Sequence, residues 1–148
     1  MSHVYVSQLI HCVFATKNRE PFITPGFRER LHAYIGGIAQ KHRFCALAVG
    51  GIEDHVHVLL SLPSTLSLSK AVQLIKGGSS HWVHETFPER TYFQWQEGYG
   101  AFSLGISQLP NTRAYIDRQI ERHQTMDYEE ELREILNKHE MDVAELVP

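Results

Sequence analysis

The sequence predicts an α+β domain of the ferredoxin-like or RRM-like kind, in which an antiparallel sheet carries helices on one face. A length of 148 residues with 43% hydrophobic residues suits one globular domain. Segments rich in β-branched and aromatic residues alternate with segments whose apolar residues recur at helical spacing. Their order is strand, helix, strand, strand, helix, one or two strands, and two final helices.

The first half of the chain predicts three strands and one helix. Residues 4–15 form a long apolar strand, and residues 16–24 form a polar loop. The helix begins after Thr24, a favourable N-cap that is followed by proline at the first helical position. Residues 44–52 and 55–62 form the second and third strands, and a Pro-Ser-Thr sequence ends the third.

The middle of the chain predicts a long helical segment and short strands. Residues 66–87 carry apolar residues at helical spacing, and Gly77-Gly78 is expected to divide them into two helical pieces. Residues 91–95 and 99–104 are expected to form strands around a Gln-Glu-Gly turn.

Two helices are expected at the C-terminal end. The first follows Leu109-Pro110-Asn111. The second starts at Asp127, an N-cap whose capping-box partner is Glu130, and continues with apolar residues at helical spacing.

Charge is distributed unevenly along the chain. The formal net charge is −3, but residues 1–124 carry 12 basic and 9 acidic side chains, whereas residues 125–148 carry 2 basic and 8 acidic ones. We therefore expect one domain over residues 1–148, with a mildly basic core at about 4–124 and an acidic helix at about 127–141. The total by itself argues against a nucleic-acid binder, because such proteins usually have a basic surface.

Composition also indicates the cellular compartment of the protein. No run of about 18 uncharged apolar residues is present, so a membrane-spanning helix is not expected. The first residues show no basic segment followed by an apolar one, so no signal peptide is expected. Cys12 and Cys45 are too few for a disulfide framework, and a reduced cytoplasmic protein is the simplest interpretation.

The sequence His55-Val56-His57 lies in the third predicted strand. Side chains at i and i+2 point to the same face, so the two imidazoles lie side by side and form half of a divalent-metal site. Asp54 could orient one of them by accepting a hydrogen bond. Two histidines that face solvent or form ordinary hydrogen bonds explain the pattern equally well.

Tyr115 and Gln119 are spaced to share one helix face. Gln119 can offer a carbonyl oxygen to a hard cation, and Tyr115 can serve as a nucleophile beside it. A packed tyrosine with a solvent-facing glutamine is the alternative. The remaining histidines show no ligand pattern; they include His81 and His84, three residues apart without a third ligand, and the isolated His11, His32, His42 and His123.

Together these residues resemble the single-tyrosine HUH transposases of small bacterial insertion sequences, where U is a hydrophobic residue. His55-Val56-His57 resembles the HUH strand, and Tyr115-Ile116-Asp117-Arg118-Gln119 resembles the Tyr-Ile-x-x-Gln helix motif. Three further segments look like family landmarks and occur in the family's order within about residues 8–124. They are Phe14 to Arg19, Lys76 to Ser80, and Trp95 to Ser103.

The resemblance implies a metal-dependent DNA transposase. Tyr115 would attack a phosphorus of single-stranded DNA at an element end marked by an imperfect-palindrome hairpin, leaving a 5′-phosphotyrosine and a free 3′-OH. A divalent cation, Mg²⁺ or Mn²⁺, would be held by His55, His57 and Gln119. The resemblance further implies a homodimer in the cytoplasm of a bacterium or archaeon. The sequence leaves open whether the tyrosine helix serves its own subunit or completes the partner's site.

Contacts to DNA are expected from basic and aromatic side chains. Tyr92, Phe93, Trp95, Tyr99 and Phe102 could stack on unpaired bases, although filling the core is the simpler role for each of these aromatics. Phosphate contacts are expected from Lys17, Arg19, Lys70, Lys76, Arg113, Arg118 and Arg122.

The acidic helix is expected to lie away from the DNA path or to temper non-specific binding. Deleting residues 127–148 would then leave specific cleavage intact or raise the non-specific DNA affinity at low salt. Two other functions fit parts of the pattern. The first is a domesticated regulator that binds DNA hairpins without cutting them. The second is a metal hydrolase that activates water through His55 and His57 and needs no tyrosine.

Overall fold

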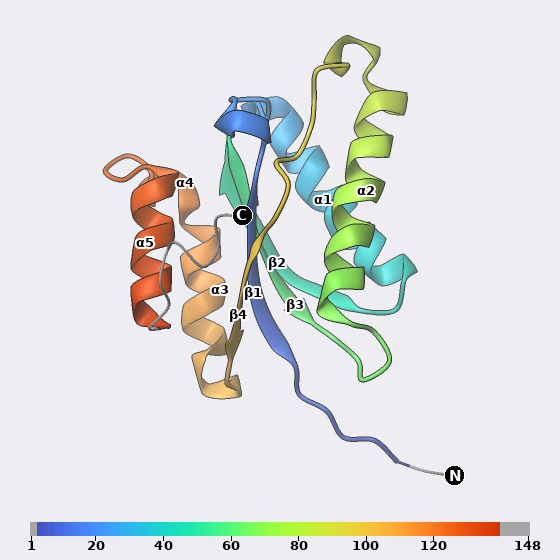
Figure 1. Cartoon of the computed structure of the whole chain (residues 1–148), viewed down its shortest axis with the longest axis vertical. Coiled ribbons are helices and arrows are strands. Elements are labelled where there is room, and N and C mark those ends of the chain that lie inside the picture. Colours follow the sequence, from blue (N-terminus) through green and yellow to red (C-terminus); the bar gives the residue numbers. More distant parts are fainter. Residues whose placement is uncertain (1–2, 140–148) are drawn as a thin grey trace.

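The computed structural model describes residues 3–139 (Figure 1). Four strands form one sheet: β1 (Leu9–Ala15), β2 (Cys45–Ile52), β3 (His55–Ser61) and β4 (Gly100–Leu104). The helices are α1 (Pro25–Lys41), α2 (Leu68–Thr86), α3 (Leu109–Asp117), α4 (Gln119–Arg122) and α5 (Tyr128–Lys138). Single 3₁₀ turns lie at Lys17–Arg19, Pro88–Arg90 and Ile106–Gln108.

The sheet has the order β2-β3-β1-β4, and all its neighbouring strands are antiparallel. With α1 and α2 as the two connecting helices, this is the ferredoxin-like arrangement, so the predicted fold class is confirmed. The central strand β3 pairs on both sides, and His57 lies opposite Val13 of β1 and Gly50 of β2.

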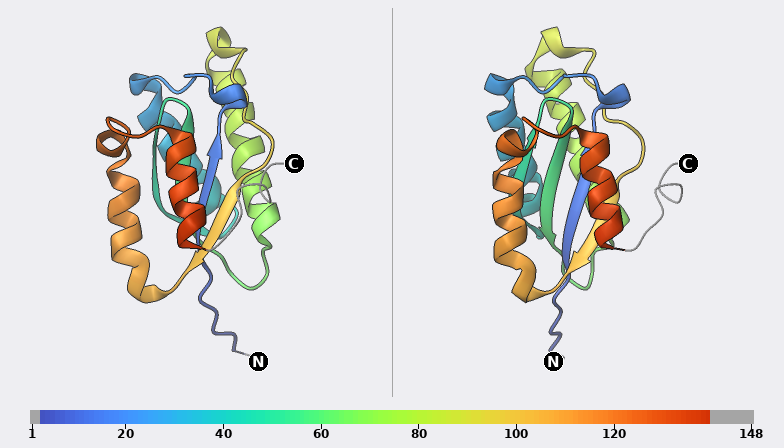
Figure 2. Two further views of the ribbon diagram at one scale, coloured as in Figure 1. Left: turned by 60° about the vertical axis from the view of Figure 1, so that its left-hand side comes forward. Right: turned by 90° about the vertical axis from the view of Figure 1, so that its left-hand side faces the viewer.

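Helices cover both faces of the sheet (Figures 1 and 2). The α1–α2 layer covers one face, as predicted, over a large core that includes Phe14, Val56 and Val58. The C-terminal helices α3 and α5 lie on the other face, where Val13 and Leu136 belong to a smaller apolar cluster. Because both faces are covered, nearly every residue of β3 is buried.

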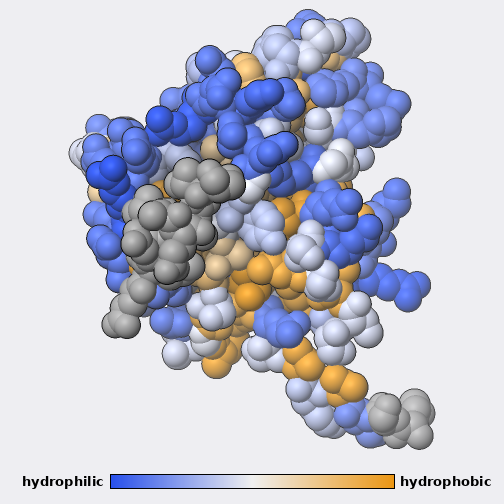
Figure 3. All heavy atoms as spheres, viewed as in Figure 1, coloured by the Kyte–Doolittle hydropathy of each residue, from blue (hydrophilic) through white to orange (hydrophobic). Residues whose placement is uncertain are grey.

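One edge of the sheet is β4, and Figure 3 shows the side of the molecule that carries this edge. Apolar atoms gather over its lower half. Leu9, Ile10, Leu66 and Leu104 help to line a groove. The upper half is largely hydrophilic. No helix within residues 3–139 is long and apolar enough to cross a membrane.

Two of the expected elements differ in the structure. The segment with Gly77-Gly78 is not divided, because α2 runs unbroken from Leu68 to Thr86. A side chain at Gly78 would lie 3.0 Å from the Cδ1 atom of Ile38, so this glycine permits close packing of α2 on α1. Residues 91–95 do not form a strand, and only an isolated bridge from Trp95 reaches Thr16.

Other elements begin or end at residues different from those predicted. The first strand starts at Leu9 instead of residue 4. The last helix begins after its predicted N-cap Asp127, whose side chain accepts a hydrogen bond from the Glu130 amide, and it ends at Lys138. Residues 140–141 of the predicted helix lie outside the described range.

Candidate functional site

His55 and His57 point from β3 into the layer formed by α3, α4 and α5, and both are fully buried. Val56, between them, points into the opposite core. This follows from strand alternation together with the cover of helices on both faces. Burial therefore excludes a His-x-His pair that faces solvent, and it leaves a metal site or a hydrogen-bonded pair.

Each of these two imidazoles is held through its Nδ1 atom. Nδ1 of His55 lies 2.7 Å from Oδ1 of Asp54, as the sequence suggested. Nδ1 of His57 lies 2.7 Å from Nε2 of His11, a residue of the neighbouring strand β1. Because the Nδ1 atoms are engaged, the two Nε2 atoms face the space under α5.

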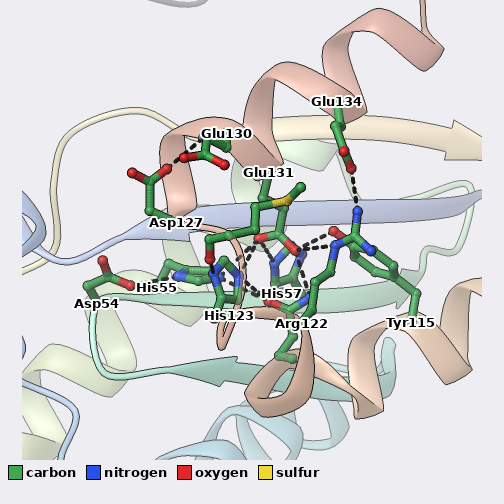
Figure 4. Close-up of polar contacts among 12 residues, drawn as sticks. Asp54, His55, His57, Tyr115, Arg122, His123, Asp127, Glu130, Glu131 and Glu134 are labelled. Carbon is green, nitrogen blue, oxygen red and sulfur yellow. Dashed lines mark hydrogen bonds and ion pairs between the residues drawn. The ribbon is translucent and has the colours of Figure 1, made fainter.

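The Nε2 atoms meet at one carboxylate oxygen (Figure 4). Oε1 of Glu131 lies 2.9 Å from Nε2 of His57, 2.9 Å from Nε2 of His123 and 3.2 Å from Nε2 of His55. His123 in turn is fixed by its Nδ1, which lies 2.6 Å from the Met126 carbonyl oxygen. The sequence pattern did not single out Glu131, His123 or His11.

Gln119 and Tyr115 also reach this group. Oε1 of Gln119 lies 3.0 Å from Nε2 of His55, and the Gln119 amide donates to Oε2 of Glu131 at 2.8 Å. The Tyr115 hydroxyl donates to the same Oε2 atom. The helix breaks at Arg118, between α3 and α4, and the two side chains nevertheless converge. We call His55, His57, Gln119, His123 and Glu131 the polar cluster.

Gly50 sets how closely α3 can approach the sheet. A side-chain carbon at this position would lie only 2.1 Å from the carbonyl oxygen of Ile116, the residue after Tyr115. The backbone of α3 therefore rests directly on β2, opposite His57. A glycine in the strand is what permits this close backbone contact.

Charge in the polar cluster is balanced by hydrogen bonds. Burial opposes ionisation of Glu131, but the imidazoles outweigh burial and hold the pKa of this carboxyl well below its usual range. Burial lowers the pKa of His55, but the hydrogen bonds of Asp54 and Glu131 raise it to about 9. Burial and the Glu131 carboxylate raise the pKa of Tyr115 above its ordinary value, so the phenol stays protonated here.

The arrangement suits a divalent cation. An imidazole whose Nδ1 carries the proton presents a lone pair at Nε2. Three Nε2 atoms and a carboxylate oxygen converge here, and either protons or a metal cation between them satisfies their lone pairs. These ligand atoms of His55, His57, His123 and Glu131 all lie within 4.8 Å of one another, and imidazole with carboxylate is a common ligand set for divalent metals.

The acidic helix lies against the site, and the sequence did not predict this contact. Glu131 comes from α5, and Ile135 and Leu136 of the same helix pack against β1 and β4 residues Val13 and Phe102. The apolar side of the helix packs on the sheet. Glu131 lies on the same side of the helix and therefore points into the polar cluster.

Six of the seven predicted phosphate-contacting residues divide into two groups, and Lys70 is exposed in the first turn of α2. Arg113, Arg118 and Arg122 lie on or beside α3 and α4, and the Arg122 guanidinium stands 4.8 Å from the centre of the Tyr115 ring. A cavity of about 350 Å³ beside Tyr115 is lined in part by His11 and Arg122.

The other group lies near the loop before β4. Lys17 and Arg19 are exposed on a 3₁₀ turn, and Arg19 lies 3.7 Å from Glu129. The Lys76 ammonium donates to the carbonyl oxygens of Gln96 and Gly98 at 2.6 and 2.9 Å, so it holds this loop.

The predicted stacking residues are likewise divided by burial. Phe93, Trp95 and Phe102 fill the cores, whereas Tyr92 and Tyr99 are exposed. Only the two tyrosines are therefore available to unpaired bases in this conformation.

Comparison with known proteins identifies the family. Residues 4–119 match the family model described as "Transposase IS200 like". The chain belongs to the IS200-like transposase family. This family carries out DNA transposition, which requires cleavage and transfer of DNA strands. The matched segment contains His55, His57, Tyr115 and Gln119 but ends before His123 and Glu131.

Individual relatives agree with this assignment. The chain is 25% identical over 126 residues to the transposase for insertion sequence element IS200 of Salmonella typhimurium, covering 82% of each chain. It is 27% identical over 119 residues to the ISDra2 transposase TnpA of Deinococcus radiodurans, covering 79% of this chain and 85% of the relative.

Solved structures share the fold. A crystal structure of a candidate transposase from Deinococcus radiodurans superposes with a TM-score of 0.65 at 22% identity, covering 80% of this chain and 96% of that one. A REP-associated tyrosine transposase bound to a REP hairpin gives a TM-score of 0.61 at 16% identity, covering 83% and 73%.

Proposed function

We propose that this transposase cuts and rejoins single-stranded DNA at hairpin-marked element ends through a 5′-phosphotyrosine intermediate on Tyr115. One observation carries the proposal. The Tyr115 hydroxyl lies against the buried His55–His57 pair, with the Tyr115 and His57 ring centres 5.7 Å apart and Glu131 between them. A DNA hairpin is proposed because a structural neighbour binds one.

Each residue has a distinct part in the proposed reaction. His55, His57 and Gln119 would hold a Mg²⁺ or Mn²⁺ ion, with Asp54 keeping the His55 imidazole in orientation. When bound, the cation polarises the scissile phosphate and neutralises charge that develops on its oxygens. Tyr115 supplies the attacking oxygen.

The atoms of the proposed reaction balance without nucleotide hydrolysis. The Tyr115 oxygen forms a bond to phosphorus, and the bond from phosphorus to the 3′ oxygen breaks. The Tyr115 proton is released, and the leaving oxygen takes up a proton to give a free 3′-OH. Attack by another 3′-OH on the phosphotyrosine then rejoins the DNA and restores the tyrosine.

Tyr115→Phe is expected to abolish the covalent adduct, because phenylalanine has no oxygen to attack phosphorus. The test incubates labelled single-stranded hairpin DNA from the ends of the protein's own locus with Mn²⁺ and separates adducts on a denaturing gel. Tyr34→Phe, which removes a hydroxyl from the opposite helical layer, serves as the control.

Mass spectrometry should place the nucleotide on the tryptic peptide of residues 114–118. An adduct that persists in Tyr115→Phe would contradict the proposal, and persistent cleavage without any adduct would indicate hydrolysis by water. Tight hairpin binding by the wild-type protein without any cleavage would indicate a regulator instead.

The structure assembles the site within one chain, which supports action in cis even in the homodimer that the family resemblance implies. Mixing Tyr115→Phe with His57→Ala protein should therefore yield no adduct. If the tyrosine helices were exchanged between subunits, mixed dimers would regain one intact site. Recovery of adduct on mixing, measured on the same gel, would show assembly in trans.

A further inference from the structure

We propose that Glu131 is a carboxylate ligand of the metal ion, so that the acidic helix α5 is a part of the catalytic centre. The inference rests on the proposed function, which gives the metal ion its role in DNA cleavage. It adds a fourth ligand to the set of His55, His57 and Gln119. It assigns to the C-terminal helix a chemical role that the Tyr-Ile-x-x-Gln motif does not contain.

Burial distinguishes Glu131 from its acidic neighbours on α5. Glu129, Glu130 and Glu134 are exposed, whereas the Glu131 side chain is 1% exposed. A carboxylate buried to this degree is costly unless positive charge compensates it. The nearest permanent cation is Arg122, whose Nε lies 3.7 Å from Oε2, so Oε1 has only imidazoles beside it among the described residues.

The surroundings of Oε1 match those of a metal ligand. The imidazoles of His55, His57 and His123 direct their Nε2 atoms at this oxygen, within 3.2 Å. Histidines that bind metals usually have their other nitrogen held by a carboxylate or a carbonyl, which here are supplied to His55 by Asp54 and to His123 by the Met126 backbone. The cluster therefore has both the ligands and the groups that orient them.

The second carboxylate oxygen connects the metal site to the nucleophile. Oε2 of Glu131 accepts hydrogen bonds from the Tyr115 hydroxyl and from the Gln119 amide. A carboxylate that binds the ion through Oε1 therefore holds the attacking oxygen of Tyr115 close to the same ion. Glu131 would act both as a ligand and as a positioning residue for Tyr115.

This role links metal binding to the docking of α5. The apolar contacts of the helix belong to the small cluster with Val13 and Phe102. A ligand on α5 adds the binding free energy of the ion to this docking, because an ion that binds only the docked state stabilises it. Metal should therefore protect the amides of α5 from hydrogen exchange.

The test measures Mn²⁺ binding to the full-length protein without DNA, by isothermal titration calorimetry and by the electron paramagnetic resonance signal of free Mn²⁺. Glu131→Gln keeps the side-chain shape but removes the charge, and we expect it to weaken Mn²⁺ binding by at least about tenfold. Glu130→Gln is the matched control, because it removes one charge from the exposed neighbouring position and should bind Mn²⁺ as the wild type does.

Hydrogen exchange gives a second readout. Mn²⁺ should slow exchange in residues 128–138 of the wild type and of Glu130→Gln but not of Glu131→Gln. If Glu131→Gln fails to fold, as judged by circular dichroism, Glu131→Asp is used instead; its shorter carboxylate should also weaken Mn²⁺ binding.

Unchanged Mn²⁺ affinity in the folded variant would overturn the proposal. Tighter binding would overturn it as well, since the carboxylate would then compete with the ion. These outcomes are separate from failure of the proposed function. Wild-type protein that binds Mn²⁺ through Glu131 but forms no DNA adduct would refute only the latter.

Discussion

Gly50→Ala is expected to slow formation of the DNA adduct by on the order of 100-fold, although Gly50 contacts neither metal nor DNA in the proposed reaction. The added carbon would lie 2.1 Å from the Ile116 carbonyl oxygen. This distance is too short unless the backbone of β2 or of α3 moves. Helix α3 must then move away from β2, and Tyr115 moves with it. A misplacement of about 1 Å is enough for a loss of this size.

The measurement compares single-turnover adduct formation with thermal unfolding. Gly36→Ala is the control, because this helical glycine has open space around it, and alanine there should stabilise the protein by about 0.5–1 kcal/mol. A folded Gly50→Ala protein that forms the adduct at the wild-type rate would show that the approach of α3 does not position the nucleophile.

Deleting residues 127–148 is expected to abolish adduct formation, which reverses the expectation drawn from charge alone. The deletion removes Glu131 from the polar cluster and uncovers Val13 and Phe102 on the sheet. Non-specific DNA affinity at low salt should rise at the same time, because the deleted segment carries 8 acidic and only 2 basic side chains.

Circular dichroism and a filter-binding assay at two salt concentrations accompany the adduct gel for this deletion. The larger core lies between the sheet and the α1–α2 layer and does not include α5. The shortened chain is therefore expected to retain its sheet. Specific cleavage at the wild-type rate by this shortened chain would show that α5 is not needed for catalysis and at most reduces non-specific DNA binding.

The sequence was sufficient for the fold class because its signals are local. Helical spacing, the Thr24-Pro25 start of α1 and the Asp127 cap all depend on neighbouring residues, and α1 and α5 begin where these signals place them. Glycines were less informative. Gly78 suggested a break, yet it serves packing against Ile38, a contact between helices that spacing alone does not reveal.

The site was predictable only where its residues follow a motif. His55, His57, Tyr115 and Gln119 are spaced by strand and helix geometry, and the structure brings them together. Glu131 stands in a run of acidic residues, so its charge resembles that of exposed neighbours.

Helical spacing offered the one available signal for Glu131. This residue lies three positions after Tyr128 and four before Ile135. Both of these residues lie on the side of α5 that packs on the sheet. His11 carried no signal of its own, because its contact with His57 depends on the register between β1 and β3.

The unequal size of the two helical layers has a consequence for the protein's motions. The α1–α2 layer shares a large core with the sheet. Helix α5 is held by a small cluster, by the buried polar contacts of Glu131 and by the exposed ion pairs of Glu129 and Glu134. Opening of α5 should therefore cost less free energy than unfolding of the whole domain. The active geometry would then be a locally closed state, and its lifetime, measured by exchange of the α5 amides, would be shorter than that of the folded chain.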